Sequence, residues 1–418
     1  MRRYFGTDGV RGIVGDDLTP DLVERIGKAA TLWGGGGRVV VGRDTRGSGP
    51  MLEEAVTRGI SSAGGVAVLG GVLPTPAVAY LAADLGVVIS ASHNPPEYNG
   101  VKLFRGGGKL VDEQEEEIEA LLDADAPGGG AVEPFRGSAD AYLTHVVESC
   151  GTDLSGLRVG LDCANGAFSA LAPRAFEGLG AEVHAIGTEP DGENINVGCG
   201  ATDLSALQLL VTREALDLGI AFDGDGDRML AVDGSGAAVD GDQIMAILAL
   251  ALGVEVVAVT VMTNLGFHAL MEEHGVRVVT TPVGDRYVSE ALRRENGLLG
   301  GEQSGHVIWF GNHATGDGLA AGLLLCRALA GRTLAEAATA MSRFPQALRN
   351  VAVERRELTP AIVEGAERLN AELGSSGRVL VRPSGTEPVV RVLAEAENAE
   401  DAEKLCASIA ALVVRELG

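Results

Sequence analysis

The sequence is poor in cysteine, lysine and aromatic residues, and each shortage narrows the possible functions. Its five cysteines are scattered among 418 residues without a CxxC pair, which argues against a disulfide framework or a cysteine-based zinc site. Only four lysines are present, and 33 basic residues oppose 58 acidic ones, so the net charge is −25. Such a surface repels the phosphates of nucleic acids and anionic membranes. We therefore expect neither as a partner.

A long uninterrupted apolar run is also lacking. The longest apolar stretch, residues 244–262, contains Gly253 and Glu255. It divides more readily into a buried helix and a buried strand than into a membrane span. The first residues, MRRYFGTDGVRG, lack the apolar centre of a secretion signal. Together with the scattered cysteines, these features predict a cytoplasmic protein with reduced thiols.

Glycine, by contrast, is abundant and lies mostly at the turns of a repeated pattern. The 60 glycines are about twice the usual share of roughly 7%. Strand-like runs begin at Arg38, Arg158 and Glu255, and each is followed by a helix-like stretch and a second strand. A third short apolar run then ends in a polar loop. The three loops read ASHNP from Ala91, DGDGDR from Asp223 and GEQSGH from Gly301.

The three polar loops occupy the same place in their repeats. Right-handed crossovers leave the carboxyl ends of parallel strands at one sheet edge, where ligands bind. Facing repeats would therefore combine a nucleophile, a metal cradle and a hydrogen-bonding loop, which indicates an enzyme. We predict an α/β protein with three similar mixed or parallel-sheet domains and a smaller C-terminal α+β domain around a central cleft. The predicted domains are 1–135, with the loop that contains Ser92 (the serine loop); 136–234, with the DGDGDR loop (the metal loop); 235–345, with the GEQSGH loop, predicted for sugar binding; and 346–418, predicted for phosphate binding.

The second loop predicts a magnesium site. Asp223, Asp225 and Asp227 alternate with glycine directly after a buried strand, so that glycine bends can bring their oxygens onto one hard cation. An EF-hand is excluded, because Arg228 stands where the turn glycine belongs and Gly234 where the bidentate glutamate belongs. The alternative is an acidic surface turn, although three acids packed after an apolar strand repel one another without a cation.

Ser92, in the first loop, has three possible roles. A serine before Asn-Pro is commonly a turn or cap residue. A hydrolase nucleophile is a second possibility, but the chain has no GxSxG, and the side chain of the adjacent His93 is expected to diverge. The third is a serine that carries a phosphoryl group whose oxygens complete the metal site. The DGDGDR loop of the next repeat favours this third role.

Three further groups of residues suit a phosphorylated substrate. The segment from Arg382 to Thr386, with Arg391 on the next strand, offers guanidinium groups, hydroxyls and backbone N–H groups for a phosphate dianion, or is an ordinary hairpin turn. Glu302 and Ser304 suit sugar hydroxyls or an amine, but could equally form a structural turn. Arg11 and Lys102 are candidate proton handlers or phosphate ligands. A lysine that is desolvated beside cations can titrate near neutrality, which would suit Lys102 to proton transfer. The alternative is that Lys102 is a solvated lysine on the surface.

These motifs, taken in order, resemble the α-D-phosphohexomutase superfamily over nearly the whole chain. They run from YFGTDGVRG at Tyr4 through ISASHNP, NGVKLF, LDCANGA, DGDGDR, VGDRYV, GGEQSGH and TGDG to RPSGTEPVVRV, which includes Arg391. The resemblance implies three similar α/β domains, a smaller fourth one, and a phosphoserine at Ser92. It also implies roles for the following residues: Ser92, Asp223, Asp225 and Asp227 for magnesium; Glu302 and Ser304 for the sugar; Arg382, Ser384, Gly385, Thr386 and Arg391 for the non-reacting phosphate; Arg11 and Lys102 beside the transferred group; and Arg228 and His93 in support of the loops, with His93 counted among the catalytic residues.

The resemblance further implies an expected reaction. Glucosamine 6-phosphate and glucosamine 1-phosphate would interconvert through phosphorylated Ser92 and a hexosamine 1,6-bisphosphate, with one Mg²⁺ per chain and the bisphosphate as primer. The product would supply UDP-N-acetylglucosamine synthesis, and the chain would act as a monomer or homodimer on a small sugar phosphate. The alternatives are a phosphomannomutase/phosphoglucomutase, a magnesium-dependent sugar phosphatase with a transient phosphoserine, and a silent sugar-phosphate-binding protein.

Overall fold

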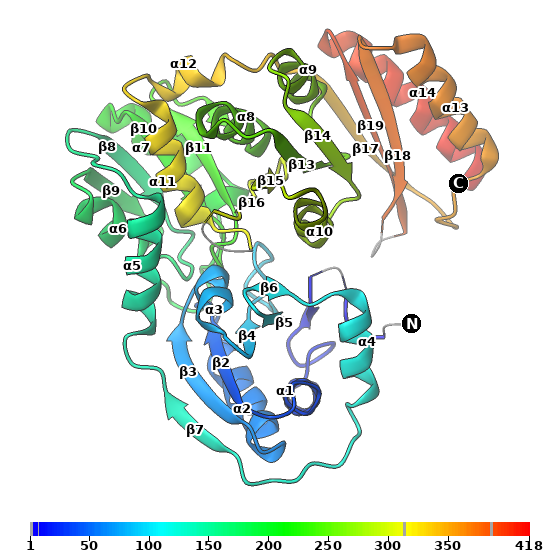
Figure 1. The fold of residues 1–418 in the computed structure, drawn as a ribbon. Coiled ribbons are helices and arrows are strands. Elements are labelled where there is room, and N and C mark those ends of the chain that lie inside the picture. Colours follow the sequence, from blue (N-terminus) through cyan, green and yellow to red (C-terminus); the bar gives the residue numbers. More distant parts are fainter. Residues whose placement is uncertain (1–2, 7, 312–314, 385–387) are drawn as a thin grey trace. The chain divides into compact units, whose positions relative to one another are not determined.

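The computed structural model describes residues 3–6, 8–311, 315–384 and 388–418 (Figure 1). Its strands form four sheets. The chain divides into two compact units: Met1–Met262 with His274–Ala340, and Thr263–Glu273 with Met341–Gly418. Each unit is described by itself. None of the helices in these described ranges combines the length and apolar character needed to cross a membrane.

The first sheet contains seven strands in the order β1-β5-β4-β2-β3-β7, with β6 paired to β5. Strands β2, β3, β4 and β7 run parallel, whereas β5 is antiparallel to β4 and β1. Helices α1 and α2 approach closely because Gly59 has no side chain to meet the Glu24 carbonyl. The elements are β1 (Val10–Ile13), α1 (Pro20–Trp33), β2 (Arg38–Arg43), α2 (Gly49–Ser62), β3 (Val66–Val72), α3 (Thr75–Leu81), β4 (Leu85–Ile89), β5 (Tyr98–Arg105), β6 (Gly108–Lys109), α4 (Asp112–Ala120) and β7 (Ala131–Pro134).

The second sheet contains five strands in the order β12-β11-β10-β8-β9. Its central strands β8 and β10 are buried over nearly their whole length, as expected for apolar strands covered by helices on both faces. The elements are α5 (Ser138–Cys150), β8 (Arg158–Asp162), α6 (Ala172–Gly178), β9 (Glu182–Ile186), the 3₁₀ turn Gly200–Thr202, α7 (Ser205–Glu214), β10 (Leu218–Phe222), β11 (Met229–Asp233) and β12 (Ala238–Val239).

The third sheet contains four strands in the order β14-β13-β15-β16. The preceding helix α8 begins with a capping box, in which the side chains of Asp240 and Gln243 bond each other's backbone N–H groups. The helix ends at Leu252 before the left-handed Gly253, and β13 follows from Val256, so the long apolar stretch divides into a helix and a strand, as predicted. The elements are α8 (Gly241–Leu252), β13 (Val256–Thr260), β14 (Arg277–Thr281), α10 (Asp285–Glu295), β15 (Leu299–Gly301), β16 (Val307–Trp309), α11 (Gly318–Leu329) and α12 (Leu334–Ala338).

One topology recurs in the three sheets. The first parallel strand lies in the middle, the second pairs on one side, the third on the other, and an antiparallel strand follows the third. The orders are β3-β2-β4-β5, β9-β8-β10-β11 and β14-β13-β15-β16. The predicted α/β repeat is therefore confirmed, and the three polar loops follow the equivalent strands β4, β10 and β15. The predicted domain boundaries stay a prediction.

The second compact unit is an antiparallel three-stranded sheet with the order β17-β19-β18, which confirms the predicted α+β character of the C-terminal region. Its core joins Ile362 of α13, Val390 and Val392 of β19, and Cys406 and Val413 of α14. Helix α14 begins after Asn398, whose side-chain oxygen accepts a hydrogen bond from the Asp401 N–H at 2.9 Å. The elements are α9 (Leu265–Glu273), β17 (Gln346–Ala352), α13 (Pro360–Leu373), β18 (Gly377–Pro383), β19 (Val389–Ala396) and α14 (Ala399–Leu417).

Candidate active site

The serine loop and the metal loop meet in the first compact unit. Ser92 lies just beyond β4 and Asp223 directly beyond β10, and both side chains are fully buried. The Ser92 Oγ donates a hydrogen bond to Asp223 Oδ2 at 2.5 Å. Ser92 has a left-handed backbone conformation, with φ of +52°, which is uncommon for a residue other than glycine. The structure thus brings together the hydroxyl and the acidic loop that sequence reasoning placed in one site.

Asp223, Asp225 and Asp227 form a buried acidic cluster. Each offers a carboxylate oxygen, and these oxygens lie within 4.8 Å of one another. Asp225 Oδ1 and Asp227 Oδ1 are buried without a hydrogen-bond partner among the described residues. Buried carboxylate oxygens normally have partners, and oxygen-only ligand sets suit magnesium. The donor set therefore fits a divalent cation.

Burial and mutual repulsion set the pKa values within this cluster. Burial, followed by repulsion from Asp227 and Asp225, raises the pKa of Asp223 to about 8. Burial opposes ionisation of Asp225 as well, but contact with Lys102 leaves the pKa of Asp225 below its ordinary value. Burial also opposes ionisation of Asp227, but Lys102 and His306 outweigh it and hold the pKa of Asp227 well below its usual range. Two of the three carboxyls are therefore ionised at neutral pH even without a cation.

Lys102 of β5 lies among carboxylates rather than cations. Its Nζ is 2.7 Å from Asp225 Oδ2, 3.1 Å from Asp227 Oδ2 and 3.3 Å from Asp8 Oδ2. Burial alone would lower the pKa of Lys102, but Asp225 and Asp227 outweigh it and raise the pKa above the ordinary value. The suggestion that Lys102 titrates near neutrality is therefore wrong, and so is the solvated alternative, because the side chain is 1% exposed. With these carboxylates around it, Lys102 is protonated at neutral pH.

Arg11, His93 and Arg228 surround the same cluster. Arg11, on β1, pairs with Asp8, and burial lowers its pKa. The Nδ1 atom of His93 lies 3.4 Å from Ser92 Oγ, so the expected divergence of these two side chains is wrong. Burial, then repulsion from Arg228 and Arg11, lowers the pKa of His93 to about 3, which makes its ring neutral at pH 7. Arg228 places its Nε 3.8 Å from Asp227 Oδ1.

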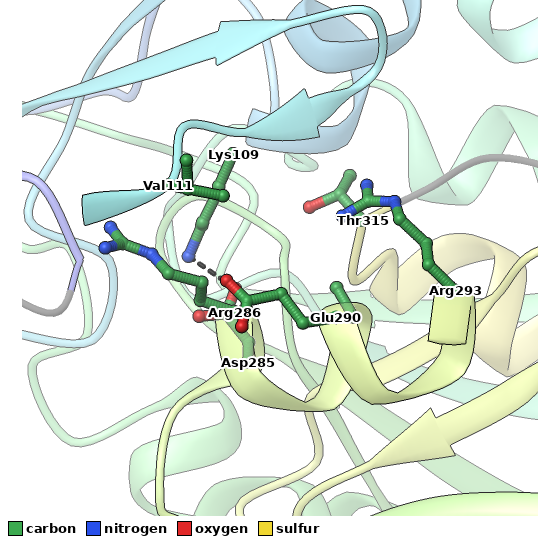
Figure 2. Close-up of a pocket in the computed structure, with 8 residues that line it drawn as sticks. Lys109, Val111, Asp285, Arg286, Glu290, Arg293 and Thr315 are labelled. Carbon is green, nitrogen blue, oxygen red and sulfur yellow. Dashed lines mark ion pairs between the residues drawn. The ribbon is translucent and has the colours of Figure 1, made fainter. Parts of the chain in front are cut away.

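Sequence reasoning missed a second row of charges behind Asp227. His306 Nδ1 lies 3.7 Å from Asp227 Oδ1, and His306 Nε2 lies 3.3 Å from Asp285 Oδ2. Asp285 Oδ2 in turn lies 2.5 Å from Lys109 Nζ, and Figure 2 shows this pair beside Arg286 in a pocket between β6 and α10. Burial opposes protonation of His306, but Asp285 and Asp227 raise its pKa to about 9. The sequence features that could have revealed this row of charges are His306 in the GEQSGH motif and Asp285 in the VGDR motif.

The third polar loop adjoins the metal loop through backbone hydrogen bonds. The Met229 N–H, next to Arg228, bonds the Gly305 carbonyl at 3.0 Å. Glu302 Oε1 accepts a hydrogen bond from the Gly284 N–H at 3.1 Å, and Ser304 Oγ lies 3.5 Å from Glu302 Oε2. Glu302 is half-buried and Ser304 exposed. Both predicted sugar contacts are thus held on a loop beside the acidic cluster.

The predicted phosphate clamp belongs to the second compact unit. Arg382 of β18 and Arg391 of β19 stand directly opposite each other in the antiparallel ladder. Side chains directly opposite each other in an antiparallel ladder lie on the same face of the sheet, so the two guanidinium groups are placed together. Ser384 is buried, with its N–H bonded to the Val389 carbonyl at 2.9 Å. Gly385 and Thr386, which were predicted to complete the clamp, lie outside the described residues.

Comparison with protein families identifies the relatives of this chain. Four models described as phosphoglucomutase/phosphomannomutase match it in order: domain I at residues 2–127, domain II at 140–236, domain III at 240–344 and the C-terminal domain at 346–412. The chain belongs to the phosphoglucomutase/phosphomannomutase family. It is thus an enzyme of the α-D-phosphohexomutase superfamily, as its motifs suggested.

Individual relatives resemble this family member over their full lengths. The phosphoglucosamine mutase of Saccharopolyspora erythraea is 50% identical, with 99% of each chain covered. That of Thermobifida fusca is 49% identical, with 100% of this chain and 99% of the relative covered. A solved structure of a phosphoglucomutase/phosphomannomutase family protein from Burkholderia thailandensis superposes with a TM-score of 0.82 at 26% identity, covering 97% of both chains.

Proposed function

We propose that this chain interconverts glucosamine 6-phosphate and glucosamine 1-phosphate through a phosphoserine at Ser92. The observation that carries the proposal is the 2.5 Å contact between Ser92 Oγ and Asp223 Oδ2 inside a buried cluster of three aspartates. The amino-sugar substrate is supported by relatives of 49–50% identity that bear the name phosphoglucosamine mutase.

Asp223, Asp225 and Asp227 would hold one Mg²⁺, together with an oxygen of phosphorylated Ser92. When bound, the ion neutralises negative charge on the phosphoryl oxygens. Lys102 and Arg11 add fixed positive charge beside the aspartates. These cations also balance the buried carboxylates, which would otherwise repel the incoming phosphate.

The reaction would consist of two opposite phosphoryl transfers. In the first, the bond from phosphorus to Ser92 Oγ breaks, a bond to O1 of glucosamine 6-phosphate forms, and the O1 proton is lost as Ser92 regains one. The resulting 1,6-bisphosphate then presents its 6-phosphate. The phosphorus–O6 bond breaks as a phosphorus bond to Ser92 Oγ forms, Ser92 loses its proton, and O6 gains one, which leaves glucosamine 1-phosphate and phosphorylated Ser92. The neutral ring of His93, whose Nδ1 lies 3.4 Å from Ser92 Oγ, would act beside the reacting oxygen as a hydrogen-bond partner that orients it.

The remaining predicted residues would orient the sugar phosphate. Glu302 and Ser304 would bind the hydroxyl and amine groups, with Arg228 supporting the adjacent loop. The non-reacting phosphate would bind the facing pair Arg382 and Arg391. Ser384, Gly385 and Thr386 would add hydroxyl and backbone N–H donors to that phosphate.

The wider setting is part of the same proposal. The product, glucosamine 1-phosphate, would supply UDP-N-acetylglucosamine synthesis in the cytoplasm. A hexosamine 1,6-bisphosphate would serve as primer, because a dephosphorylated Ser92 cannot begin the cycle. The chain would work as a monomer or a homodimer.

A phosphomannomutase/phosphoglucomutase activity is the second candidate. The four family models and the Burkholderia thailandensis structure carry that description. The structure is 26% identical to this chain, whereas the phosphoglucosamine mutases are 49–50% identical. We therefore place the amino sugar first.

The test is a comparison of kcat/KM on the 6-phosphates of glucosamine, glucose and mannose, with and without Mg²⁺ and bisphosphate primer. We expect the highest value for glucosamine 6-phosphate and no turnover without Mg²⁺. Equal values on the three sugars would defeat the amino-sugar assignment. Release of free phosphate instead of isomerised sugar phosphate would indicate a phosphatase.

A further inference from the structure

Arg46 is a fully buried arginine whose contacts converge on the Ser92 loop, here defined as residues 90–98. Its Nη2 donates to the carbonyls of Ser92 at 2.9 Å and Asn94 at 2.8 Å. Its Nη1 donates to the carbonyl of Tyr98 at 2.9 Å and to that of Pro95. The Nε donates to Asp44 Oδ2 at 2.8 Å. All five N–H donors of the guanidinium are thus engaged by the chain itself.

The partner of Arg46 holds the other side of Ser92. Asp44 Oδ2 also accepts a hydrogen bond from Ser90 Oγ at 2.5 Å, and Ser90 Oγ accepts one from the Ser92 N–H at 2.9 Å. The N–H and the carbonyl of Ser92 are therefore both tied to one buried ion pair. The pair is fully buried, with neither side chain exposed.

The second domain adds contacts to the same carbonyls. The Asn196 side-chain amide donates to the carbonyls of Ser92 at 2.9 Å and Asn94 at 3.2 Å. Gly224, between two of the aspartates, leaves room for this arrangement, because a Cβ there would lie 2.8 Å from the Ser92 carbonyl oxygen. The loop is thus held on both sides at the place where Ser92 Oγ reaches Asp223.

We propose that Arg46 is a positioning residue, which holds Ser92 in its left-handed conformation so that Oγ stays on the aspartate cluster. A phosphoryl transfer depends on the placement of the oxygen that gives and receives the group. The fork of the guanidinium is needed, since four carbonyls must be reached at once, and a lysine ammonium has only three donors. Only the expected fall in kcat rests on the proposed function. The structural part of the inference, that Arg46 holds the Ser92 loop, does not.

The experiment compares Arg46→Lys with Arg58→Lys, a matched control at an exposed arginine that pairs with Glu24 and Glu54 on helices α1 and α2. For Arg46→Lys we expect kcat to fall about 100-fold, while KM for the sugar phosphate stays within about twofold. Amide hydrogen exchange of residues 90–98 should become faster, with protection elsewhere in the first domain retained. Arg58→Lys should behave as the unsubstituted protein.

The proposal is overturned if folded Arg46→Lys keeps both its kcat and the exchange protection of the Ser92 loop. It is also overturned if exchange rises evenly over the whole domain, because Arg46 would then serve general stability. If Arg46→Lys does not fold, Asn196→Gly decides by the same readouts, since it removes a donor to the same carbonyls and tolerates the left-handed backbone at that position. Hydrogen exchange tests the role of Arg46 without a measurement of activity. A protein that is inactive on every sugar phosphate would therefore contradict the proposed function but not the positioning role of Arg46.

Discussion

The loop after β4 and the loop after β10 occupy the same place in two copies of one fold, but different interactions stabilise them. Within the metal loop, the Arg228 N–H bonds Asp223 Oδ1 at 3.1 Å and the Gly226 N–H, at φ of +76°, bonds the Asp223 carbonyl at 3.1 Å. Its long-range bonds come from several separate segments, such as the Thr75 N–H on the Asp225 carbonyl at 2.8 Å. The Ser92 loop also has local bonds, but four of its carbonyls are held by one side chain, that of Arg46, 46 residues before Ser92.

This difference shows how a repeated fold acquires different chemistry at equivalent positions. Glycine supplies the backbone freedom that brings three carboxylates together. Ser92 must keep a side chain, so its left-handed conformation requires other groups to stabilise it. Three variants at the two loops test this contrast, and a fourth lies outside both loops for comparison. They are ordered by the expected loss of activity.

Ser92→Ala should have the largest effect. It removes the oxygen that would carry the phosphoryl group, and we expect mutase turnover to fall by at least about 1000-fold. Intact mass should show no phosphorylated protein after incubation with bisphosphate. Ser155→Ala, an exposed serine of the second domain, is the control. Turnover by Ser92→Ala at the rate of the unsubstituted protein would refute the phosphoserine role.

Asp225→Asn should follow. It removes a carboxylate that has one buried oxygen without a hydrogen-bond partner in the described structure, and we expect kcat to fall about 100- to 1000-fold. The unsubstituted protein should gain thermal stability on addition of Mg²⁺, because the ion binds the folded state, and Asp225→Asn should lose most of that gain. An unchanged magnesium-dependent Tm shift would argue against this ligand. Asp125→Asn, at an exposed position, is the matched control.

Gly224→Ala tests the contact between the two loops. An added Cβ would lie 2.8 Å from the Ser92 carbonyl oxygen and 2.7 Å from Ile195 Cδ1, so one loop must shift. We expect kcat to fall about 10- to 100-fold, with KM little changed. Gly178→Ala is the matched control, because its Cβ would meet nothing within 4 Å. Equal kinetics in the two variants would show that close approach of the loops is unnecessary.

Tyr142→Phe should leave catalysis unchanged and lower stability. The buried Tyr142 hydroxyl donates to both carboxylate oxygens of Asp317 at 2.9 Å, and Asp317 caps the N-terminus of α11. Burial, together with Asp317, raises the pKa of Tyr142 well above its ordinary value, so the donor stays protonated. We expect a loss of about 1.5–3 kcal/mol in the free energy of unfolding, measured by urea denaturation. A large fall in kcat would instead show that the hydrogen bond between Tyr142 and Asp317 contributes to catalysis.

Much of the fold and part of the site could be predicted from the sequence. The alternation of apolar strands with helix-like stretches predicted the three repeats, and the position of DGDGDR after a buried strand predicted the cluster of Asp223, Asp225 and Asp227. Arg46 and Asp44 could not be found in this way. They stand in a short segment whose residues resemble an ordinary surface turn, and their importance arises from contacts with a loop far along the chain.

Lys102 illustrates the same limit for electrostatics. The sequence made it a candidate proton handler or phosphate ligand, but its pKa depends on which charges surround it in space. The three carboxylates around it come from two domains. Two of them, Asp225 and Asp227, reverse the direction of the pKa shift that burial alone would produce.

The sequence by itself determined the repeated strand–helix pattern, the glycine-bounded turns and the residue types of each polar loop, because periodicity and turn chemistry are local properties of the chain. Only the tertiary structure decided that Ser92 faces Asp223, that Arg46 engages the loop carbonyls, and that His306 joins Asp227 to Asp285. These are through-space relations between distant segments. Burial sets their strength by removing the water that would otherwise screen the charges.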